Sequence, residues 1–240
     1  MIIGIVGGMG SYATVSFFKR IVDAFPGEKE WDRPRILIDN YCTIPSRVRA
    51  VLYKERIREL VSGIKDSIEN LMRVGADKII IGCNTAHVFL PDVIELLPEA
   101  NSKIIDLIEM AAMRSNEKHC KHVRLIASEG TYLSDIYPKY FDKYSIEVSN
   151  SKKEELIREL MEDVKQNKIT DSSLSKFSDL IKTENGGVDG VILGCTELPV
   201  LYSQLPGSDP YHDMIIDPLE CAIIKLCNDF REENHQGENS

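Results

Sequence analysis

The feature that most constrains the fold is a short motif that occurs twice in the chain. In each copy, a run of aliphatic residues leads into Gly-Cys and then into two polar residues, at 79–85 (IIIGCNT) and 191–197 (VILGCTE). The two copies are separated by nearly half of the 240 residues. Because each copy has the pattern of a buried strand that turns into a helix, the repeat predicts two similar α/β halves.

The rest of the chain shows the same alternation of strands and helices. We expect strands at 2–6, 35–40, 78–81, 103–105, 123–127, 145–148, 188–193 and 214–217. We expect helices at 13–25, 57–72, 86–97 and 152–166, a last helix opened by Pro218, and a frayed polar tail after Phe230. Such alternation indicates parallel sheets that are covered by helices on both faces.

Both Gly-Cys turns then lie at the carboxyl ends of parallel strands, where open α/β sheets place their ligands. The strand pattern restarts after Pro98, which marks the end of the first half. The predicted fold class is therefore α/β, with two pseudo-symmetric open parallel-sheet domains and the active site in the cleft between them.

Composition argues against several classes of function. The net charge is -9, whereas a nucleic-acid-binding protein needs a basic surface. We find neither an apolar run of the ~18 residues that a membrane helix needs nor a secretory signal, so we expect a cytoplasmic protein. The six cysteines form no Cys-x-x-Cys pair, which predicts reduced thiols rather than a disulfide framework or a zinc site.

Cys83 and Cys195 are the candidate catalytic residues. A single cysteine after a strand is usually a small core residue, and the other four cysteines keep a core or surface interpretation. For Cys83 and Cys195 the repeated context favours a catalytic interpretation instead, because backbone N–H groups at a helix start stabilise a thiolate. Two such groups on opposite faces of one carbon suit stereoinversion, in which one thiolate removes a proton and the opposite thiol supplies another.

A glycine-rich turn at 4–13 (GIVGGMGSYA) follows the first strand and opens a helix. Gly8, Gly10 and Ala13 fit a loose dinucleotide fingerprint. The same backbone N–H groups can instead hold a carboxylate, which makes Met9 and Gly10 candidate substrate contacts. A purely structural turn is an equal alternative.

Three further positions bring charge or hydroxyl groups toward the predicted site. Arg47 can bind a carboxylate through two hydrogen bonds, unless it belongs to a solvated basic face with its neighbouring arginines. The segment 127–131 (ASEGT) brings Thr131 to a strand end, or simply caps a helix. Lys165 ends a charged helix and, taken alone, is a surface lysine. The five histidines match no catalytic or zinc signature.

These motifs together resemble the aspartate/glutamate racemase superfamily, and within it the aspartate racemases. The resemblance covers nearly the whole chain and rests on five blocks: GIVGGMG at 4–10, IPSR at 44–47, GCNTAH at 82–87, ASEGT at 127–131 and GCTELP at 194–199. Ser11 departs from a common proline and Ser128 from a common threonine. The resemblance implies domains at 1–98 plus 206–240 and at 99–205, with the last helix returning to the first domain, and it implies a homodimer.

The resemblance also implies catalysis without pyridoxal phosphate, metal or nucleotide, so that no cofactor is needed. Cys83 and Cys195 match the two bases, with Cys195 facing the L-substrate and Cys83 the D-substrate, and Glu197 matches a residue that orients or polarises Cys195. The other matches are substrate contacts: Asn84, Thr85 and Thr196 near the α-carboxylate, Thr131 in the pocket, Arg47 at the side-chain carboxylate and Lys165 as a second cation.

The predicted function is the interconversion of L- and D-aspartate by 1,1-proton transfer, with a dicarboxylic amino acid as the small-molecule partner. Glutamate, or both amino acids, is the nearest alternative, because one methylene group changes binding only modestly. A nucleotide-dependent oxidoreductase would use the glycine-rich turn but leaves the twin Gly-Cys turns unexplained. The remaining alternatives are a two-lobed protein that binds dicarboxylates without catalysis and another isomerase chemistry of the superfamily.

Overall fold

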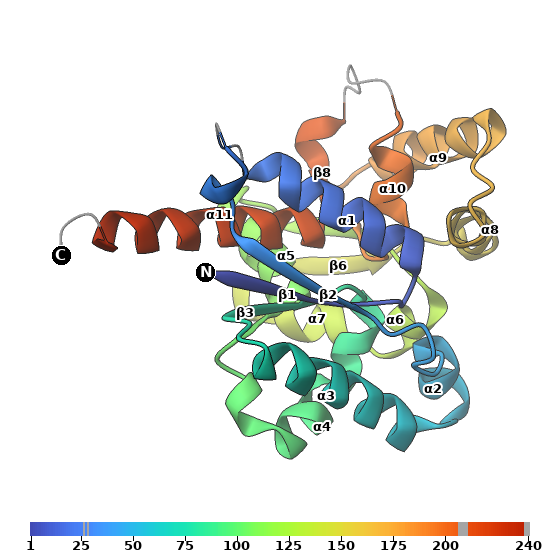
Figure 1. Cartoon of the computed structure of the whole chain (residues 1–240). Coiled ribbons are helices and arrows are strands. Elements are labelled where there is room, and N and C mark those ends of the chain that lie inside the picture. Colours follow the sequence, from blue (N-terminus) through green and yellow to red (C-terminus); the bar gives the residue numbers. More distant parts are fainter. Residues whose placement is uncertain (26, 28, 206–210, 238–240) are drawn as a thin grey trace.

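The computed structural model describes residues 1–25, 27, 29–205 and 211–237, which form two parallel four-stranded sheets (Figure 1). The strand order of the first sheet is β2 (Arg35–Asn40), β1 (Ile2–Gly7), β3 (Lys78–Ile81) and β4 (Ile104–Ile105). The second sheet repeats this order with β6 (Glu147–Asn150), β5 (His122–Ile126), β7 (Gly190–Leu193) and β8 (Ile215–Ile216). The predicted α/β class with two similar parallel-sheet halves is confirmed.

Helices connect the strands in both halves. Up to β5 the chain forms α1 (Ser11–Ala24), η1 (Glu30–Asp32), α2 (Arg47–Tyr53), α3 (Ile57–Arg73), η2 (Asn84–Phe89), α4 (Leu90–Leu96), η3 (Pro98–Ala100) and α5 (Leu107–Glu117). Beyond β5 it forms α6 (Glu129–Leu133), α7 (Ile136–Phe141), η4 (Asp142–Tyr144), α8 (Glu154–Lys165), α9 (Asp171–Glu184), α10 (Leu198–Tyr202), η5 (His212–Met214) and α11 (Pro218–Gly237).

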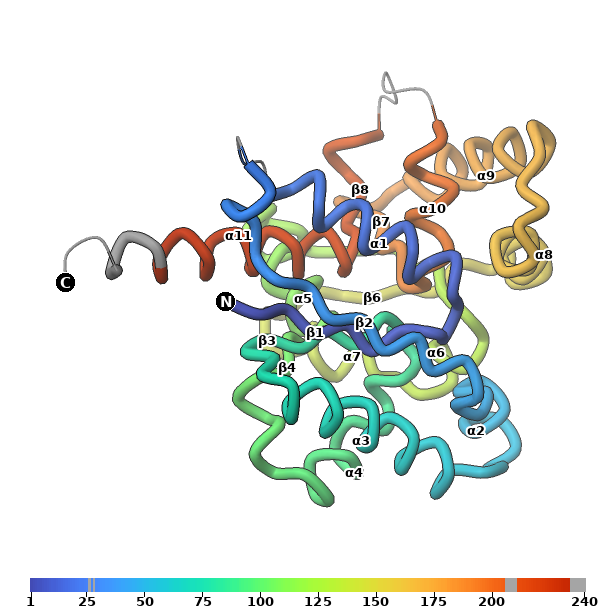
Figure 2. Tube along the Cα trace, viewed as in Figure 1, coloured from blue at the N-terminus to red at the C-terminus, as the bar shows by residue number. Residues whose placement is uncertain are grey.

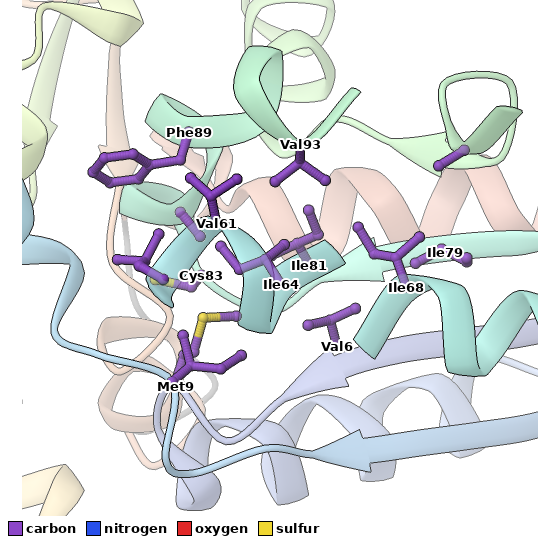
Figure 3. Packing of buried hydrophobic residues seen from close by; sticks show 14 of the residues in the cluster. Val6, Met9, Val61, Ile64, Ile68, Ile79, Ile81, Cys83, Phe89 and Val93 are labelled. Carbon is purple, nitrogen blue, oxygen red and sulfur yellow. The ribbon is translucent and has the colours of Figure 1, made fainter. Parts of the chain in front are cut away.

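Both faces of the first sheet are covered by helices, which explains why its central strands are aliphatic at almost every position. Ile79 and Ile81 of β3 pack with α3 and α4, whereas Ile80 packs on the opposite face with α1 and α11. Figure 3 shows the first of these clusters, with Cys83 and Met9 at one end of it, beyond Ile81. Burying one such aliphatic side chain stabilises the fold by about 1.5–3 kcal/mol.

The second sheet is covered in the same way. Leu125 of β5 packs in one cluster with α5, α6 and α7, and the next residue, Ile126, packs in another with α8, α9 and α10. The last helix, α11, runs back beside α1 and contributes Leu219 and Leu226 to the core of the first sheet (Figure 2). Residue 206, where the first domain is expected to resume, lies outside the described residues.

Two predicted elements are displaced, and local hydrogen bonding explains both. The segment after Cys83 is not one helix over 86–97, because Pro91 has no N–H for the carbonyl of His87, which bonds to Leu90 N instead. A 3-10 turn, η2, therefore precedes α4. The strand expected at 145–148 begins only at Glu147, because Ser145 has a left-handed φ of 55° that completes the preceding turn.

The prediction of a frayed tail after Phe230 is wrong for the described part of that segment, since α11 continues to Gly237. Phe230 packs edge-on against Phe25 with ring centroids 5.4 Å apart. Glu233 forms an ion pair with the amino group of Met1 at 3.3 Å. These contacts tie the polar end of the helix to the first half. Among the described residues, no helix has the length and apolarity that crossing a membrane requires.

Candidate active site

The two Gly-Cys turns occupy equivalent places and meet each other. Each follows a strand that lies beside the first strand of its half, β3 beside β1 and β7 beside β5, which is where the strand order of an open sheet reverses. The N–H of Gly82 bonds to the carbonyl of Val6 at 2.9 Å, and the N–H of Gly194 bonds to the carbonyl of Ile126 at 2.8 Å. Thr196 Oγ1 donates to the carbonyl of Gly82 at 3.4 Å, which joins the two turns directly.

The Cys195 thiol has a hydrogen-bond acceptor that favours its protonated form. Its Sγ donates to Glu197 Oε2 at 2.9 Å. Burial raises the pKa of the Cys195 thiol well above its usual range, and the electrostatic influence of the Glu197 carboxylate and of Cys83 raises it further. The expectation that a helix start favours a thiolate is therefore wrong for Cys195: a backbone hydrogen bond at Glu197 does lower this pKa, but burial and the carboxylate outweigh it.

Cys83 is 8% exposed and lies at the end of the core of the first sheet. Behind Cys83, His87 Nδ1 bonds to the Cys83 carbonyl at 3.0 Å and His87 Nε2 accepts from Leu107 N at 3.2 Å. Both ring nitrogens of His87 are thus held by backbone groups, which gives the ring the structural role that we expect from the sequence.

The polar residues after each cysteine bridge the two halves. Asn84 Oδ1 accepts from the Tyr137 hydroxyl at 2.9 Å. Thr85 Oγ1 lies 3.1 Å from Ser128 Oγ and 2.8 Å from Thr131 Oγ1, and the latter two are 3.1 Å apart. All five of these side chains are buried. The predicted contacts Thr85 and Thr131 therefore share one hydrogen-bond network with Ser128, whereas Asn84 bonds separately to Tyr137.

Arg47 lies at the start of α2 and is held by the glycine-rich turn. Its Nη2 donates to the carbonyl of Met9 at 2.8 Å and its Nη1 to the carbonyl of Pro45 at 3.2 Å. The sequence prediction gave Met9 and Gly10 backbone N–H contacts to substrate, whereas the Met9 carbonyl orients Arg47. This fixes the plane of the guanidinium without consuming all of its donors.

Lys165, at the end of α8, approaches the same place from the second half. A Cβ added to Gly10 would lie 3.0 Å from Glu197 Oε1 and 3.8 Å from Lys165 Cγ, so these three residues converge. Lys165 Nζ donates to Glu162 Oε1 at 2.8 Å. Burial disfavours the charge on Lys165, but the hydrogen bond to Glu162 and the negative charge of Glu197 outweigh burial and raise its pKa.

Three buried polar atoms of the site lack a hydrogen-bond partner among the described residues. They are the donors Arg47 Nε and Asn84 Nδ2 and the acceptor Glu197 Oε1. Leaving such a group unpaired costs about 1–3 kcal/mol, so the set indicates a ligand that supplies the missing partners. A molecule with carboxylates for the two donors and an ammonium group for the acceptor has the right chemistry.

Other parts of the site have no clear counterpart in the sequence pattern. Tyr137 and Glu162 show no motif of their own, and they were not expected near the cysteines. Beside Lys165, a cavity of about 240 Å³ opens between α2 and α8 and is lined by Ser46, Ser128 and Arg158 among others. Among the described residues, no group of three His, Cys, Asp or Glu side chains is placed to hold a metal ion.

Two similar parallel-sheet halves with one site at their switch points define a class of α/β protein that binds a small molecule between two lobes. The model of the Asp/Glu/hydantoin racemase family matches residues 6–226, and the chain belongs to this family. The predicted resemblance is thereby confirmed, and the protein is an amino-acid racemase by family. The dinucleotide interpretation of the glycine-rich turn loses its support.

The names of individual relatives differ in substrate and include aspartate, glutamate and broad-specificity racemases. The solved structure of the aspartate racemase of Picrophilus torridus superposes with a TM-score of 0.81 and 27% sequence identity, over 96% of this chain and 97% of that one. The glutamate racemase of Shewanella woodyi is 28% identical over 207 residues, which are 83% of this chain and 75% of that protein. The broad specificity amino-acid racemase RacX of Bacillus subtilis is 23% identical over 224 residues, which are 91% and 93% of the two chains.

Proposed function

We propose that this protein interconverts L- and D-aspartate without a cofactor, using Cys83 and Cys195 as the two bases. The observation that carries the proposal is the pair of equivalent Gly-Cys turns, which the hydrogen bond from Thr196 to the carbonyl of Gly82 joins directly. A stereocentre held between two such sulfurs exchanges its proton from one face to the other.

The proton transfers balance in both directions. For the L-substrate, the Cys195 thiolate removes the α-proton on one face while the Cys83 thiol donates a proton on the other. The product leaves Cys195 protonated and Cys83 deprotonated, and the reverse reaction starts from that state. Glu197, which accepts the Cys195 hydrogen bond at 2.9 Å, takes up the thiol proton when Cys195 must act as the base.

The unpaired atoms of the site support a dicarboxylic amino acid. Arg47 Nε and the Lys165 ammonium group suit the side-chain carboxylate, Asn84 Nδ2 suits the α-carboxylate, and Glu197 Oε1 suits the ammonium group. The negative charge that develops when the α-proton leaves is then shared with fixed donors in a buried site, where electrostatic stabilisation is strongest. The cavity beside Lys165 is the route by which we expect the substrate to enter.

Glutamate is the second candidate substrate, because curated relatives such as the Shewanella woodyi protein carry that activity in their names. Aspartate is favoured by the higher structural similarity and coverage of the Picrophilus torridus aspartate racemase. The homodimer, the cytoplasmic location and the two-domain division stay predictions.

The test is to incubate EDTA-treated protein with L-aspartate or L-glutamate in D2O and to follow the α-proton signal and the chirality of the product. We expect exchange and inversion with aspartate, and no inversion in Cys83→Ala or Cys195→Ala. Binding of aspartate without exchange would favour the non-catalytic alternative. Wild-type rates in either cysteine variant would show that the two-base assignment is wrong.

A further inference from the structure

One hydrogen bond crosses from the second half to the residue that follows Cys83. Tyr137 lies on α7 with its side chain fully buried, and its hydroxyl donates to Asn84 Oδ1 at 2.9 Å. Asn84 is 2% exposed and opens η2, directly after the Gly-Cys turn. A tyrosine of one half therefore bonds to the side chain next to Cys83 in the other half.

The direction of this bond follows from the protonation of the phenol. Burial raises the pKa of the Tyr137 hydroxyl well above its usual range, and the electrostatic influence of nearby acidic groups raises it further. The hydroxyl therefore keeps its proton and needs an acceptor, which Asn84 Oδ1 provides. The opposite orientation of the amide would leave both the Tyr137 proton and Asn84 Oδ1 unpaired, which is costly in a buried site.

This orientation turns Asn84 Nδ2 away from Tyr137. Asn84 Nδ2 is buried and has no partner in the described part of the chain, although the amide group carries two donor hydrogens. The hydroxyls of Thr85, Ser128 and Thr131, by contrast, bond to one another. The Asn84 amide is thus the preoriented and unoccupied donor next to Cys83.

We propose that Tyr137 is a positioning residue that locks the Asn84 amide so that Nδ2 donates to the carboxylate beside the reacting carbon. This inference rests on the function proposed above. As the α-proton leaves, negative charge moves onto that carboxylate, and a fixed donor stabilises the charge as it forms. Without the hydroxyl, the amide is free to rotate and to present Oδ1, which repels a carboxylate.

The first test is Tyr137→Phe, which removes the hydroxyl and keeps the ring. We expect kcat/KM for the racemised amino acid to fall about tenfold or more, the loss typical of a hydrogen bond to a charged group. Tyr140→Phe is the matched control, because Tyr140 lies on the same helix and its hydroxyl donates to Asp106 Oδ2 at 2.7 Å. We expect that control to stay within about twofold of wild type.

A double-mutant cycle separates positioning from general stability. If Tyr137 acts through Asn84, Tyr137→Phe has no further effect on kcat/KM in an Asn84→Ala background. Full additivity of the two losses, or wild-type kcat/KM in Tyr137→Phe, would overturn the proposal. If Tyr137→Phe does not fold, Asn84→Asp decides: it keeps an acceptor for Tyr137 but replaces the Nδ2 donor by oxygen, and wild-type activity in it would equally overturn the proposal.

Binding distinguishes this inference from the proposed function. If the wild-type protein racemises neither aspartate nor glutamate, the proposed function fails, and L-aspartate binding is then measured by calorimetry. If Tyr137→Phe binds L-aspartate more weakly and Tyr140→Phe binds it as wild type does, the result supports the proposal that Tyr137 orients the Asn84 amide. Equal binding by wild type and Tyr137→Phe, or no binding by either, refutes it.

Discussion

The two Gly-Cys turns are alike in sequence but differ in how closely they are packed, and alanine substitutions expose the difference. A Cβ at Gly194 would lie 2.5 Å from Leu125 Cδ1 and 3.0 Å from Ala127 Cβ. Carbon atoms in contact normally lie ~3.5–4.0 Å apart, and Leu125 is fully buried. Gly194→Ala therefore overpacks the second half, which costs about 1–3 kcal/mol of unfolding free energy. For a chain of this length, that lowers Tm by roughly 2–12 °C.

Gly82→Ala is the matched control in the other half. A Cβ there would meet only the carbonyl oxygen of Val6, at the ordinary distance of 3.4 Å, and neither glycine is among those with a positive φ. We expect its unfolding free energy to stay within about 0.5 kcal/mol of wild type. Urea unfolding followed by circular dichroism measures both variants. Equal destabilisation, or a larger effect at Gly82, would refute this account of the packing around the two turns.

Three further predictions concern the site. His87→Leu should lower the unfolding free energy by about 1–3 kcal/mol in the same urea assay, because it leaves Leu107 N–H buried without its partner. Unchanged stability would show that this hydrogen bond does not stabilise the fold. Lys165→Met should raise KM for aspartate in a racemisation assay with less effect on melting temperature, whereas an unchanged KM would place Lys165 outside the substrate site. Because the pKa of Cys195 is raised, its thiolate appears only as pH rises above the usual thiol range. Alkylation of Cys195 by iodoacetamide should be slow at neutral pH, and Glu197→Gln should move its onset to lower pH; an onset that does not move would show that the Glu197 charge is not a cause.

The sequence was sufficient to predict the parallel strands, because buried strands such as β3 consist almost entirely of aliphatic residues. The long helix α3 was equally clear from its apolar periodicity and from Gly75, whose φ is 96°. The start of β6 could not be predicted in this way. Its position depends on a left-handed turn at Ser145, and the pattern of aliphatic residues gives no sign of that turn.

The site shows the same division between local pattern and tertiary contact. The paired cysteines and their polar neighbours could be predicted because each motif is continuous in sequence. The Tyr137 bond to Asn84 and the link from Thr196 to Gly82 could not, since each joins residues far apart in the chain. The raised pKa of Cys195 also escaped prediction, because burial and the Glu197 carboxylate outweigh the helix start that the sequence displays.

The central claim is that two different groups serve the two faces of one carbon, and the position of the isotope tests it most directly. Wild-type protein is given L-aspartate in D2O, and both enantiomers are separated and analysed by mass spectrometry while conversion is still low. Transfer between two bases predicts that the newly formed D-aspartate carries deuterium while the remaining L-aspartate still carries protium. Deuterium appearing in the recovered L-aspartate as fast as in the D-product would mean that one base serves both faces, and would contradict the account.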